Sequence, residues 1–213
     1  FVKVPVKELV ATEYLQQRAQ QVNRTAISPP PSVKPGLAES LQTTHFSILD
    51  SAGNAVSLTY TLNGSFGNGV VVGGAGFLLN NEMDDFSVKP GVPNLYGVVG
   101  ATANEIAPGK RMLSSMTPTI LLKDGVVHGV LGTPGGSTIF TSVFQTLVNL
   151  FDHGMTATEA VSAPRFHHQL IPGTLIIVSR CCNLPEKTRA ELVAMGYEVR
   201  QNSWEFGDMQ VIE

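Results

Sequence analysis

A proline-rich segment divides this chain of 213 residues into two unequal parts. Residues 23–40, NRTAISPPPSVKPGLAES, carry four prolines and one glycine. Because proline fixes φ and lacks an amide donor, neither a helix nor a central strand can run through this segment. The preceding residues 6–22 have the apolar spacing and residue types of one amphipathic helix. We therefore expect a helix, then an extended exposed segment, then a separate folded region.

The residues after this segment show strand patterns first and helix patterns later. Strand alternation is found at 44–50 and 55–62, around the turn DSAGN, and a second hairpin turns at Asp124-Gly125. Further patterns predict helices at 137–154, 156–162 and 184–196, and strands at 174–179 and 197–201. This order predicts an α+β domain in which helices cover the faces of the sheets.

The composition excludes several classes of partner. Charged residues make up 15% of the chain and the formal net charge is −3, so no basic surface is available for nucleic acid. No apolar run reaches the roughly 18 residues of a membrane span, and we expect a small or neutral partner. The chain starts at Phe1 without methionine or a signal-peptide pattern, and we expect it to be a piece of a longer polypeptide.

The residues that most often bind metals give no metal pattern here. The only cysteines, Cys181 and Cys182, are adjacent. A bond between neighbouring cysteines is strained, so we predict neither a structural disulfide nor a zinc site. His167 and His168 are adjacent too, and outside a helix such a pair rarely shares one ion. We therefore expect both histidines to serve packing.

A glycine pair, Gly135-Gly136, stands between the second hairpin and the helix expected from Ser137. Three interpretations remain open. The pair can simply allow a tight strand-to-helix turn, the amides of the helix start can bind an anion, or the same amides can form an oxyanion hole. A phosphate-binding loop is excluded, because GTPGGST lacks the lysine and the spacing of that motif.

Two polar clusters lie in the expected loops. Glu82, Asp84 and Asp85 fall in NNEMDDF, which lacks the ligand spacing of a calcium loop. A solvated cluster and a partner for a substrate ammonium group are the two interpretations. Ser114 and Ser115 precede an expected strand, where local capping or turn bonds are favoured.

Five segments together resemble the γ-glutamyltranspeptidase (glutathione hydrolase) family, in order and at matching separations. The similarity covers nearly the whole chain, and the five segments are TTHFSILDSAGNAVSLTYTLN, GAGFLLNNEMDDFS, KRMLSSMTPTI, LGTPGGS and APRFHHQ. This family belongs to the N-terminal nucleophile hydrolases, so the resemblance implies a four-layer αββα sandwich, of which this chain would form part. It also implies a precursor that cuts itself before a threonine into a large and a small subunit.

Transferred to this sequence, the family's cleavage point falls between Gln42 and Thr43. Residues 1–42 would then be the tail of the large subunit with its pre-cleavage loop, and residues 43–213 the small-subunit catalytic region. The resemblance makes Thr43 the nucleophile, and a freed N-terminal threonine can use its own α-amine as the base. Thr61 matches the residue whose hydroxyl orients that nucleophile.

The remaining matches imply a binding site for a γ-glutamyl group, with separate contacts for its α-amino end, its α-carboxylate and the oxyanion. These contacts are, respectively, Asn63, Glu82 and Asp85; Ser114 and Ser115; and Gly135 and Gly136.

The reaction implied by the resemblance is acyl transfer through a γ-glutamyl ester of Thr43, with glutathione and other γ-glutamyl amides as substrates. Water or an amino acid is the acceptor, and no metal or other cofactor is expected. Related amidases of the same fold, acting on a cephalosporin side chain or on poly-γ-glutamate, are alternatives, as is a non-catalytic binding module. The resemblance further implies the large subunit as a partner and a periplasmic or secreted location.

Two departures from the family pattern bear on activity. The arginine that clamps the α-carboxylate belongs to the family's large subunit, and the sequence ends at FGDMQVIE, before the family's closing segment. We therefore expect this chain alone to be weakly active or inactive. If Thr43 stays joined to Gln42, its amine is locked in a peptide bond and cannot act as a base. Thr44 and His45 are expected to have structural roles.

Overall fold

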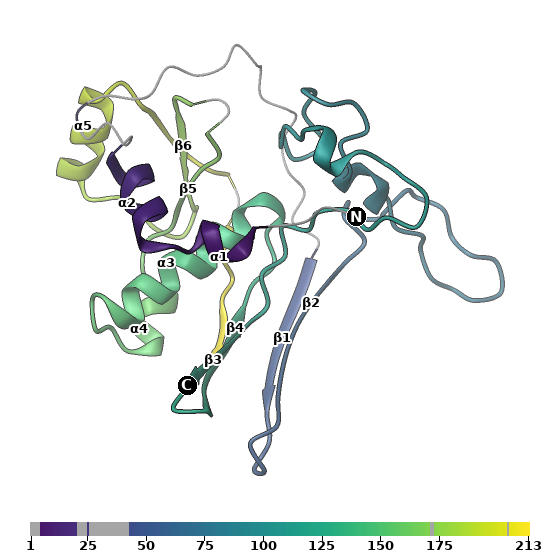
Figure 1. Ribbon diagram of the computed structural model, residues 1–213, viewed down its shortest axis with the longest axis horizontal. Coiled ribbons are helices and arrows are strands. Elements are labelled where there is room, and N and C mark those ends of the chain that lie inside the picture. Colours follow the sequence, from purple (N-terminus) through teal and green to yellow (C-terminus); the bar gives the residue numbers. More distant parts are fainter. Residues whose placement is uncertain (1–4, 21–24, 26–42, 171–172, 204) are drawn as a thin grey trace.

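The computed structural model describes residues 5–20, 25, 43–170, 173–203 and 205–213. Within these ranges, helices accompany three small β-sheets, whose strand orders are β1–β2, β3–β4–β8 and β5–β6–β7 (Figure 1). A long irregular stretch, residues 62–118, connects β2 to β3. This stretch contains two short 3₁₀ turns, η1 (Glu82–Asp85) and η2 (Thr102–Asn104).

The first sheet is a hairpin whose register places Thr43 opposite Thr61. Strands β1 (Thr43–Leu49) and β2 (Ala55–Thr61) pair antiparallel along their full length. Asp50 fixes the turn, because its carboxylate accepts a hydrogen bond from the amide of Asn54 at 2.8 Å. The first and last residues of the hairpin are therefore brought side by side.

The second sheet is antiparallel throughout and consists of β3 (Thr119–Lys123), β4 (Val126–Gly132) and β8 (Gln210–Ile212). Its first turn is Asp124-Gly125, with left-handed φ angles of 53° and 82°. This is the backbone that an Asp-Gly pair favours in a two-residue hairpin loop, so the predicted turn is confirmed.

Ser57 joins the hairpin β1–β2 to the second sheet. Its hydroxyl donates to the carbonyl of Leu131 at 3.0 Å and accepts the amide of Thr119 at 3.0 Å. One side chain of β2 thus bonds to both β3 and β4. The two sheets face each other across this contact, with the hairpin on the right in Figure 1.

His45 fills the space between the same two sheets. Its side chain is 7% exposed, and its ring bonds to the hydroxyls of Thr59 at 2.8 Å and Ser47 at 3.2 Å. The ring lies directly over Gly132 of β4, where an added Cβ would stand 2.1 Å from a ring carbon. The close approach of the sheets therefore depends on a residue without a side chain at 132.

Helices α3 (Ile139–Phe151) and α4 (Ala157–Ser162) cover the face of the second sheet that points away from β1 and β2 (Figure 1). The core between them contains buried Leu131, Val143 and Met209. A capping box begins α4, in which Thr156 and Glu159 bond to each other's backbone amides.

The third sheet combines β5 (Phe166–His168), β6 (Leu175–Val178) and β7 (Glu198–Gln201). Strands β5 and β6 pair antiparallel, whereas β6 and β7 pair parallel. A parallel pair needs a crossover connection, and helix α5 (Glu186–Ala194) lies in that connection.

The helix predicted over residues 6–22 is wrong as one continuous element. The structure has two helices, α1 (Val6–Leu9) and α2 (Thr12–Gln20), and residues 21–22 lie outside the described ranges. β-branched Val10 and Thr12 flank the break, and no residue of either helix is buried. A short helix without tertiary packing is only marginally stable.

Other differences from the sequence expectations are small. The remaining predicted helices and strands are present, with ends that move by up to three residues. The three-residue strands β5 and β8 were not expected. The proline-rich segment lies outside the described residues, apart from Thr25.

The contact between the sheets predicts a large effect of a small substitution. Gly132→Ala should lower the stability of the full-length protein by about 1–3 kcal/mol, because the His45 ring and the β4 backbone must separate. Gly73→Ala is the matched control, since a Cβ at that position meets nothing within 4 Å. Urea unfolding followed by fluorescence measures both. An unchanged midpoint for Gly132→Ala would contradict the packing described here.

Candidate active site

The first side chain of β1 and the last side chain of β2 meet at one end of the hairpin. The hydroxyl of Thr43 donates to the hydroxyl oxygen of Thr61 at 3.1 Å, and both residues are half-buried. The same oxygen of Thr61 accepts the amide of Asn63 at 2.9 Å. With both acceptor positions of Thr61 used, its own proton is left to donate. Gln42 lies outside the described residues.

Asn63 turns the chain away from β2 and is almost completely buried. Its φ is 68°, a left-handed value that asparagine tolerates better than most residues, and it is 3% exposed. Its side-chain amide donates to the carbonyl of Asn81 at 3.2 Å. The Asn81 side chain in turn accepts the amide of Gly64 at 2.8 Å. These bonds place the loop that begins at Asn81 against the end of β2.

Gly135 and Gly136 form a buried turn between β4 and α3. Their φ angles are 142° and 56°, values that residues with a Cβ rarely adopt. The carbonyl of Gly135 accepts both the amide of Thr138 at 3.0 Å and its hydroxyl at 2.7 Å. The tight turn among the three interpretations is therefore present. The anion and oxyanion interpretations stay predictions.

Tyr96 connects the glycine turn to Asn63, a contact that no pattern in the sequence indicates. The Tyr96 hydroxyl donates to the carbonyl of Asn63 at 2.5 Å. Its ring lies against Gly136, where an added Cβ would stand 2.8 Å from a ring carbon. Gln169 holds the backbone of this loop by donating to the carbonyl of Tyr96 at 3.0 Å. Tyr96 thus lies between the glycine turn and the end of β2 and sets the distance between them.

Glu82 and Asp85 are two carboxyl groups close together in η1. Burial raises the pKa of Glu82 to about 7, with a further contribution from the negative charge of Asp85. Burial also raises the pKa of Asp85. Oxygen Oε1 of Glu82 is buried without a hydrogen-bond partner among the described residues, and neither group takes part in the ion pairs found there. Within the described residues, no cationic side chain forms an ion pair with either carboxyl group.

Asp84 and a nearby cavity are separate from the pair Thr43–Thr61. Asp84 accepts the amide of Leu95 at 2.8 Å and so holds the loop. A cavity of about 390 Å³ lies behind this loop, lined among others by Asp85, Asn104 and Leu113. Thr43 does not line it.

Ser114 and Ser115 form only local hydrogen bonds with the residues that the structure describes. The hydroxyl of Ser114 is exposed and accepts the amide of Met116 at 3.2 Å. The carbonyl of half-buried Ser115 accepts the hydroxyl of Thr117 at 3.1 Å. These are the local turn bonds expected from the sequence, and the structure does not join the serines to the threonine pair.

The two adjacent histidines pack in the third sheet. His167 is 3% exposed and bonds to Thr141 at 2.9 Å and Gln169 at 3.2 Å, and burial lowers its pKa. His168 bonds to the carbonyl of Gly173 at 3.0 Å. In the part of the chain that the structure describes, no group of three or more His, Cys, Asp or Glu side chains is placed to hold a metal.

The carboxyl pair predicts a titration near neutral pH. In Asp85→Asn the pKa of Glu82 should fall below 7 but stay above 4.5, because burial is the larger cause of its shift. Asp84→Asn is the matched control and should lower this pKa less, because Asp84 raises the pKa of Asp85 and is not among the causes of the Glu82 shift. Carboxyl ¹³C NMR of labelled glutamate measures the titration. Equal shifts in the two variants would contradict the described geometry.

A linked effect on stability has a definite sign. The pKa of Glu82 is raised from 4.5 to about 7 in the folded protein, so the unfolded chain releases this proton first. The free energy of unfolding should therefore fall as the pH rises from about 4.5 to about 7. Glu82→Gln should flatten this part of the profile, as measured by urea unfolding at a series of pH values.

Comparison with known proteins gives a consistent match over the whole chain. The family model described as gamma-glutamyltranspeptidase matches residues 1–213. The glutathione hydrolase proenzyme of Pseudomonas aeruginosa is 59% identical over 212 residues, which is 100% of this chain and 38% of that protein. This chain thus spans less than half the length of that relative.

Solved structures share the fold. The γ-glutamyltranspeptidase from Pseudomonas nitroreducens complexed with L-DON has a TM-score of 0.76 and 60% identity, over 79% of this chain and 87% of that chain. A cephalosporin acylase from Bacillus halodurans has a TM-score of 0.77 at 25% identity, over 99% of this chain and 35% of that chain. The α+β fold class expected from the sequence is confirmed, and the chain belongs to the γ-glutamyltranspeptidase family.

Proposed function

We propose that this chain is the catalytic part of a γ-glutamyl hydrolase/transferase that acts on glutathione and other γ-glutamyl amides. The observation that supports it most is the hydroxyl pair Thr43–Thr61, 3.1 Å apart at the start of β1. If Thr43 becomes the first residue of its chain, three groups lie close together: its hydroxyl as the nucleophile, its α-amine as the base, and the hydroxyl of Thr61. The names of its relatives support the same chemistry, since the Pseudomonas aeruginosa protein is called a glutathione hydrolase proenzyme.

The first half of the reaction forms an ester on Thr43. Cleavage of the bond after Gln42 frees the α-amine of Thr43, which takes the hydroxyl proton as the oxygen attacks the γ-carbonyl carbon. The Thr61 hydroxyl then donates a hydrogen bond to the attacking oxygen and keeps its proton, in reversal of the hydrogen bond seen in the structure. Amides of Gly135 and Gly136 stabilise the negative oxygen. The intermediate collapses, and the leaving amine departs with the proton from the α-amine.

The second half returns the enzyme to its starting state. Water attacks the ester carbonyl to give glutamate, or the amine of an amino acid attacks to give a new γ-glutamyl amide. The α-amine of Thr43 accepts the proton of the attacking group and passes it to the Thr43 oxygen as the ester breaks. Apart from the substrate and the acceptor, both steps use groups of the protein: the Thr43 α-amine, the hydroxyls of Thr43 and Thr61, and two backbone amides.

The half-buried carboxyl pair supports an amino-acid head group as the part of the substrate that is recognised. Among the described residues Glu82 and Asp85 form no ion pair, oxygen Oε1 of Glu82 is buried without a partner, and an arriving ammonium group supplies the missing cation. Asn63 lies next to them through its bond to Asn81. Ser114 and Ser115 are proposed to bind the α-carboxylate, which requires them to exchange their local bonds for bonds to the substrate.

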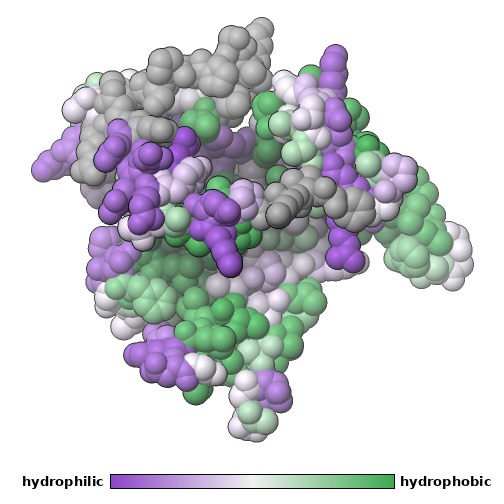
Figure 2. Space-filling model, in the orientation of Figure 1, coloured by the Kyte–Doolittle hydropathy of each residue, from purple (hydrophilic) through white to green (hydrophobic). Residues whose placement is uncertain are grey.

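The outer face of the hairpin supports the large subunit as a partner. Apart from Thr44, the residues exposed on this face have large apolar or aromatic side chains: Phe46, Ile48, Val56, Leu58 and Tyr60. Figure 2 shows apolar surface across the lower part of the view, where α3, β3, β4 and the hairpin lie in Figure 1. Within the described residues no helix covers this face, although an αββα sandwich has helices on both outer sides. We propose that the rest of the polypeptide, the large subunit, supplies that layer.

The location of the protein is also a proposal. A periplasmic or secreted site accords with the family. Among the residues that the structure describes, no helix has both the length and the apolar character to cross a bilayer.

An acylase of the same fold is the second candidate. The likeness to the cephalosporin acylase over 99% of this chain supports it. The carboxyl pair favours the first candidate, because a substrate with an ammonium group gains from two nearby negative charges. The two are separated by comparing γ-glutamyl-p-nitroanilide with a cephalosporin side-chain amide that has no ammonium group.

Replacement of the nucleophile tests the proposed function directly. In the full-length protein, Thr43→Ala should abolish self-cleavage and lower γ-glutamyl-p-nitroanilide turnover by at least about 10³-fold. Thr44→Ala, at the neighbouring exposed position, should still be cut and remain active. N-terminal sequencing of the small fragment should begin at Thr43. Equal activity of wild type and Thr43→Ala would rule the proposal out.

Tyr96 provides a second test with a smaller expected effect. Tyr96→Phe removes the hydrogen bond to Asn63 but keeps the ring against Gly136. One lost hydrogen bond corresponds to about 0.5–1.5 kcal/mol, so kcat/KM should fall by about 2- to 10-fold. Tyr197→Phe, whose ring packs on His168, should behave as wild type. The spacing role of Tyr96 is wrong if both variants retain full kcat/KM.

A further inference from the structure

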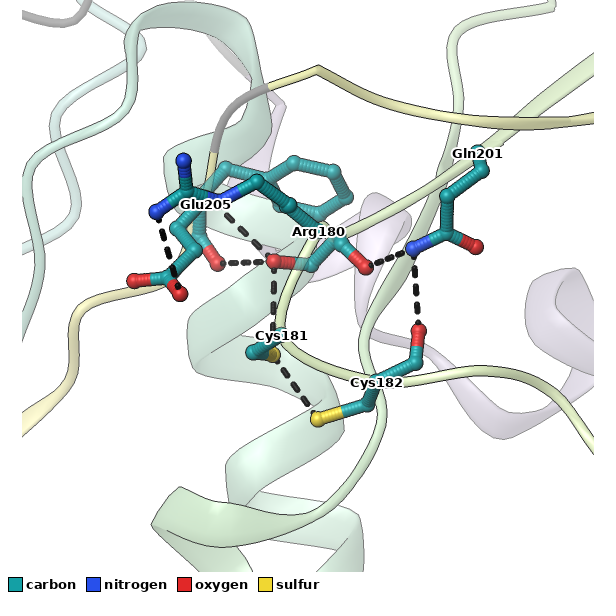
Figure 3. Close-up of polar contacts among 7 residues, drawn as sticks. Arg180, Cys181, Cys182, Gln201 and Glu205 are labelled. Carbon is teal, nitrogen blue, oxygen red and sulfur yellow. Dashed lines mark hydrogen bonds and ion pairs between the residues drawn. The ribbon is translucent and has the colours of Figure 1, made fainter.

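Two cysteine side chains that follow β6 are in contact. Sγ of Cys182 lies 2.8 Å from Sγ of Cys181 (Figure 3). Successive side chains of a strand point to opposite faces, whereas the turn after β6 places both thiols on the same side. Cys181 is exposed and Cys182 is half-buried, so a small molecule can reach the pair.

Hydrogen bonds from neighbouring elements hold this turn in place. The side-chain amide of Gln201, at the end of β7, donates to the carbonyls of Ser179 at 2.5 Å and Cys182 at 3.1 Å (Figure 3). The hydroxyl of Ser179 accepts the amide of Phe206 at 3.2 Å and the thiol of Cys181 at 3.5 Å. The two sulfurs therefore face each other on a backbone that is tied on both sides.

A buried cation faces the pair. The Arg165 side chain is 4% exposed and donates to the carbonyls of Ala160 and Val161. Its guanidinium interacts electrostatically with both Cys181 and Cys182. Positive charge beside a thiol favours the thiolate, which is the reactive form; for Cys182 this effect lowers the pKa, although burial, the largest cause, raises it.

We propose that Cys181 and Cys182 form a thiol–disulfide exchange site that reacts with small-molecule disulfides and closes reversibly to a bond between the two cysteines. In the first step the Cys181 thiolate attacks one sulfur of the small disulfide, a mixed disulfide forms, and one small thiolate leaves. In the second step the Cys182 thiolate attacks the Cys181 sulfur, and the second small thiolate leaves. The protein loses two thiol hydrogens, and the small disulfide is reduced to two thiols.

The order of attack follows from the surroundings of Cys182. The pKa of this thiol is raised to about 11, mainly by burial. Its hydrogen bond to Cys181 and the charge of Cys181 are smaller causes that raise the pKa further. The first attack therefore belongs to exposed Cys181. Once Cys181 carries the mixed disulfide, its hydrogen bond and its charge no longer hold back ionisation of Cys182. The neighbouring sulfur is then attacked within the same turn.

The product is a reversible bond rather than a structural one. Adjacent Cα atoms are about 3.8 Å apart across a trans peptide, which is shorter than the roughly 4.4–6.8 Å of ordinary disulfides. A strained and exposed disulfide is easily reduced. This accords with the expectation from the sequence that the pair does not form a structural disulfide.

Intact mass under defined redox conditions tests the proposal. The full-length protein is equilibrated without oxygen in buffers of increasing glutathione disulfide, quenched in acid and weighed, then treated with dithiothreitol and weighed again. The wild type should lose the mass of two hydrogen atoms and regain it. Cys182→Ser should instead keep one glutathione adduct, and Cys181→Ser should react at least about tenfold more slowly.

Three results would overturn the proposal. The wild type keeps both thiols at the most oxidising ratio, it carries a lasting glutathione adduct, or it forms disulfide-linked dimers. Peptide mapping of the oxidised wild type must also place the new bond within the segment that contains Cys181 and Cys182. A bond elsewhere counts against the proposal as well.

Discussion

The hydrogen bond between Thr43 and Thr61 depends on the register of one hairpin, and the rest of the site is arranged around it. This hairpin is fixed on the second sheet by Ser57 and by the ring of His45 over Gly132. Strand β4 ends at Gly132 and leads directly into the turn at Gly135-Gly136. The packing of two sheets thus sets the position of the proposed nucleophile relative to the proposed oxyanion site.

The half-buried carboxyl pair shows how a cost in stability accompanies a candidate binding site. Burial raises the pKa of both Glu82 and Asp85; the charge of Asp85 raises the pKa of Glu82 further, and the charge of Asp84 raises that of Asp85. A structural role alone would be served as well by a neutral pair. In the proposed complex an ammonium group restores the balance of charge, so its binding is favoured by the same burial that destabilises the empty pair. The large subunit is likewise the proposed partner of the apolar outer face of the hairpin.

Local patterns in the sequence predicted the elements whose stability is local. The Asp124-Gly125 turn, both hairpins and the helices after Gly136 have turn residues, alternation or helical spacing that act over a few residues. Strands β5 and β8 are three residues long and exist because neighbouring strands provide their partners. The break between α1 and α2 reflects missing tertiary packing. The role of Tyr96 could not be predicted from the sequence, because Tyr96 and its partner Asn63 are 33 residues apart and the chain between them is irregular.

The residues of the candidate site that were named from the sequence also fall into two groups: those that the structure brings together and those that have only local bonds. The family resemblance named Thr43, Thr61, Glu82 and Asp85, and the structure brings the members of each pair together. Ser114 and Ser115 have only local bonds here. The contact between Cys181 and Cys182 could not be foreseen, because adjacency in sequence does not determine whether two side chains point the same way.

The central claim is that Thr43 carries the acyl group during turnover. Acid quenching of the full-length protein during turnover of a γ-glutamyl substrate, followed by peptide mass spectrometry, measures this directly. The account predicts one γ-glutamyl adduct on the peptide that begins with Thr43, joined through its hydroxyl and lost on mild alkaline treatment. An adduct on another residue, or turnover without any adduct on that peptide, would contradict the account.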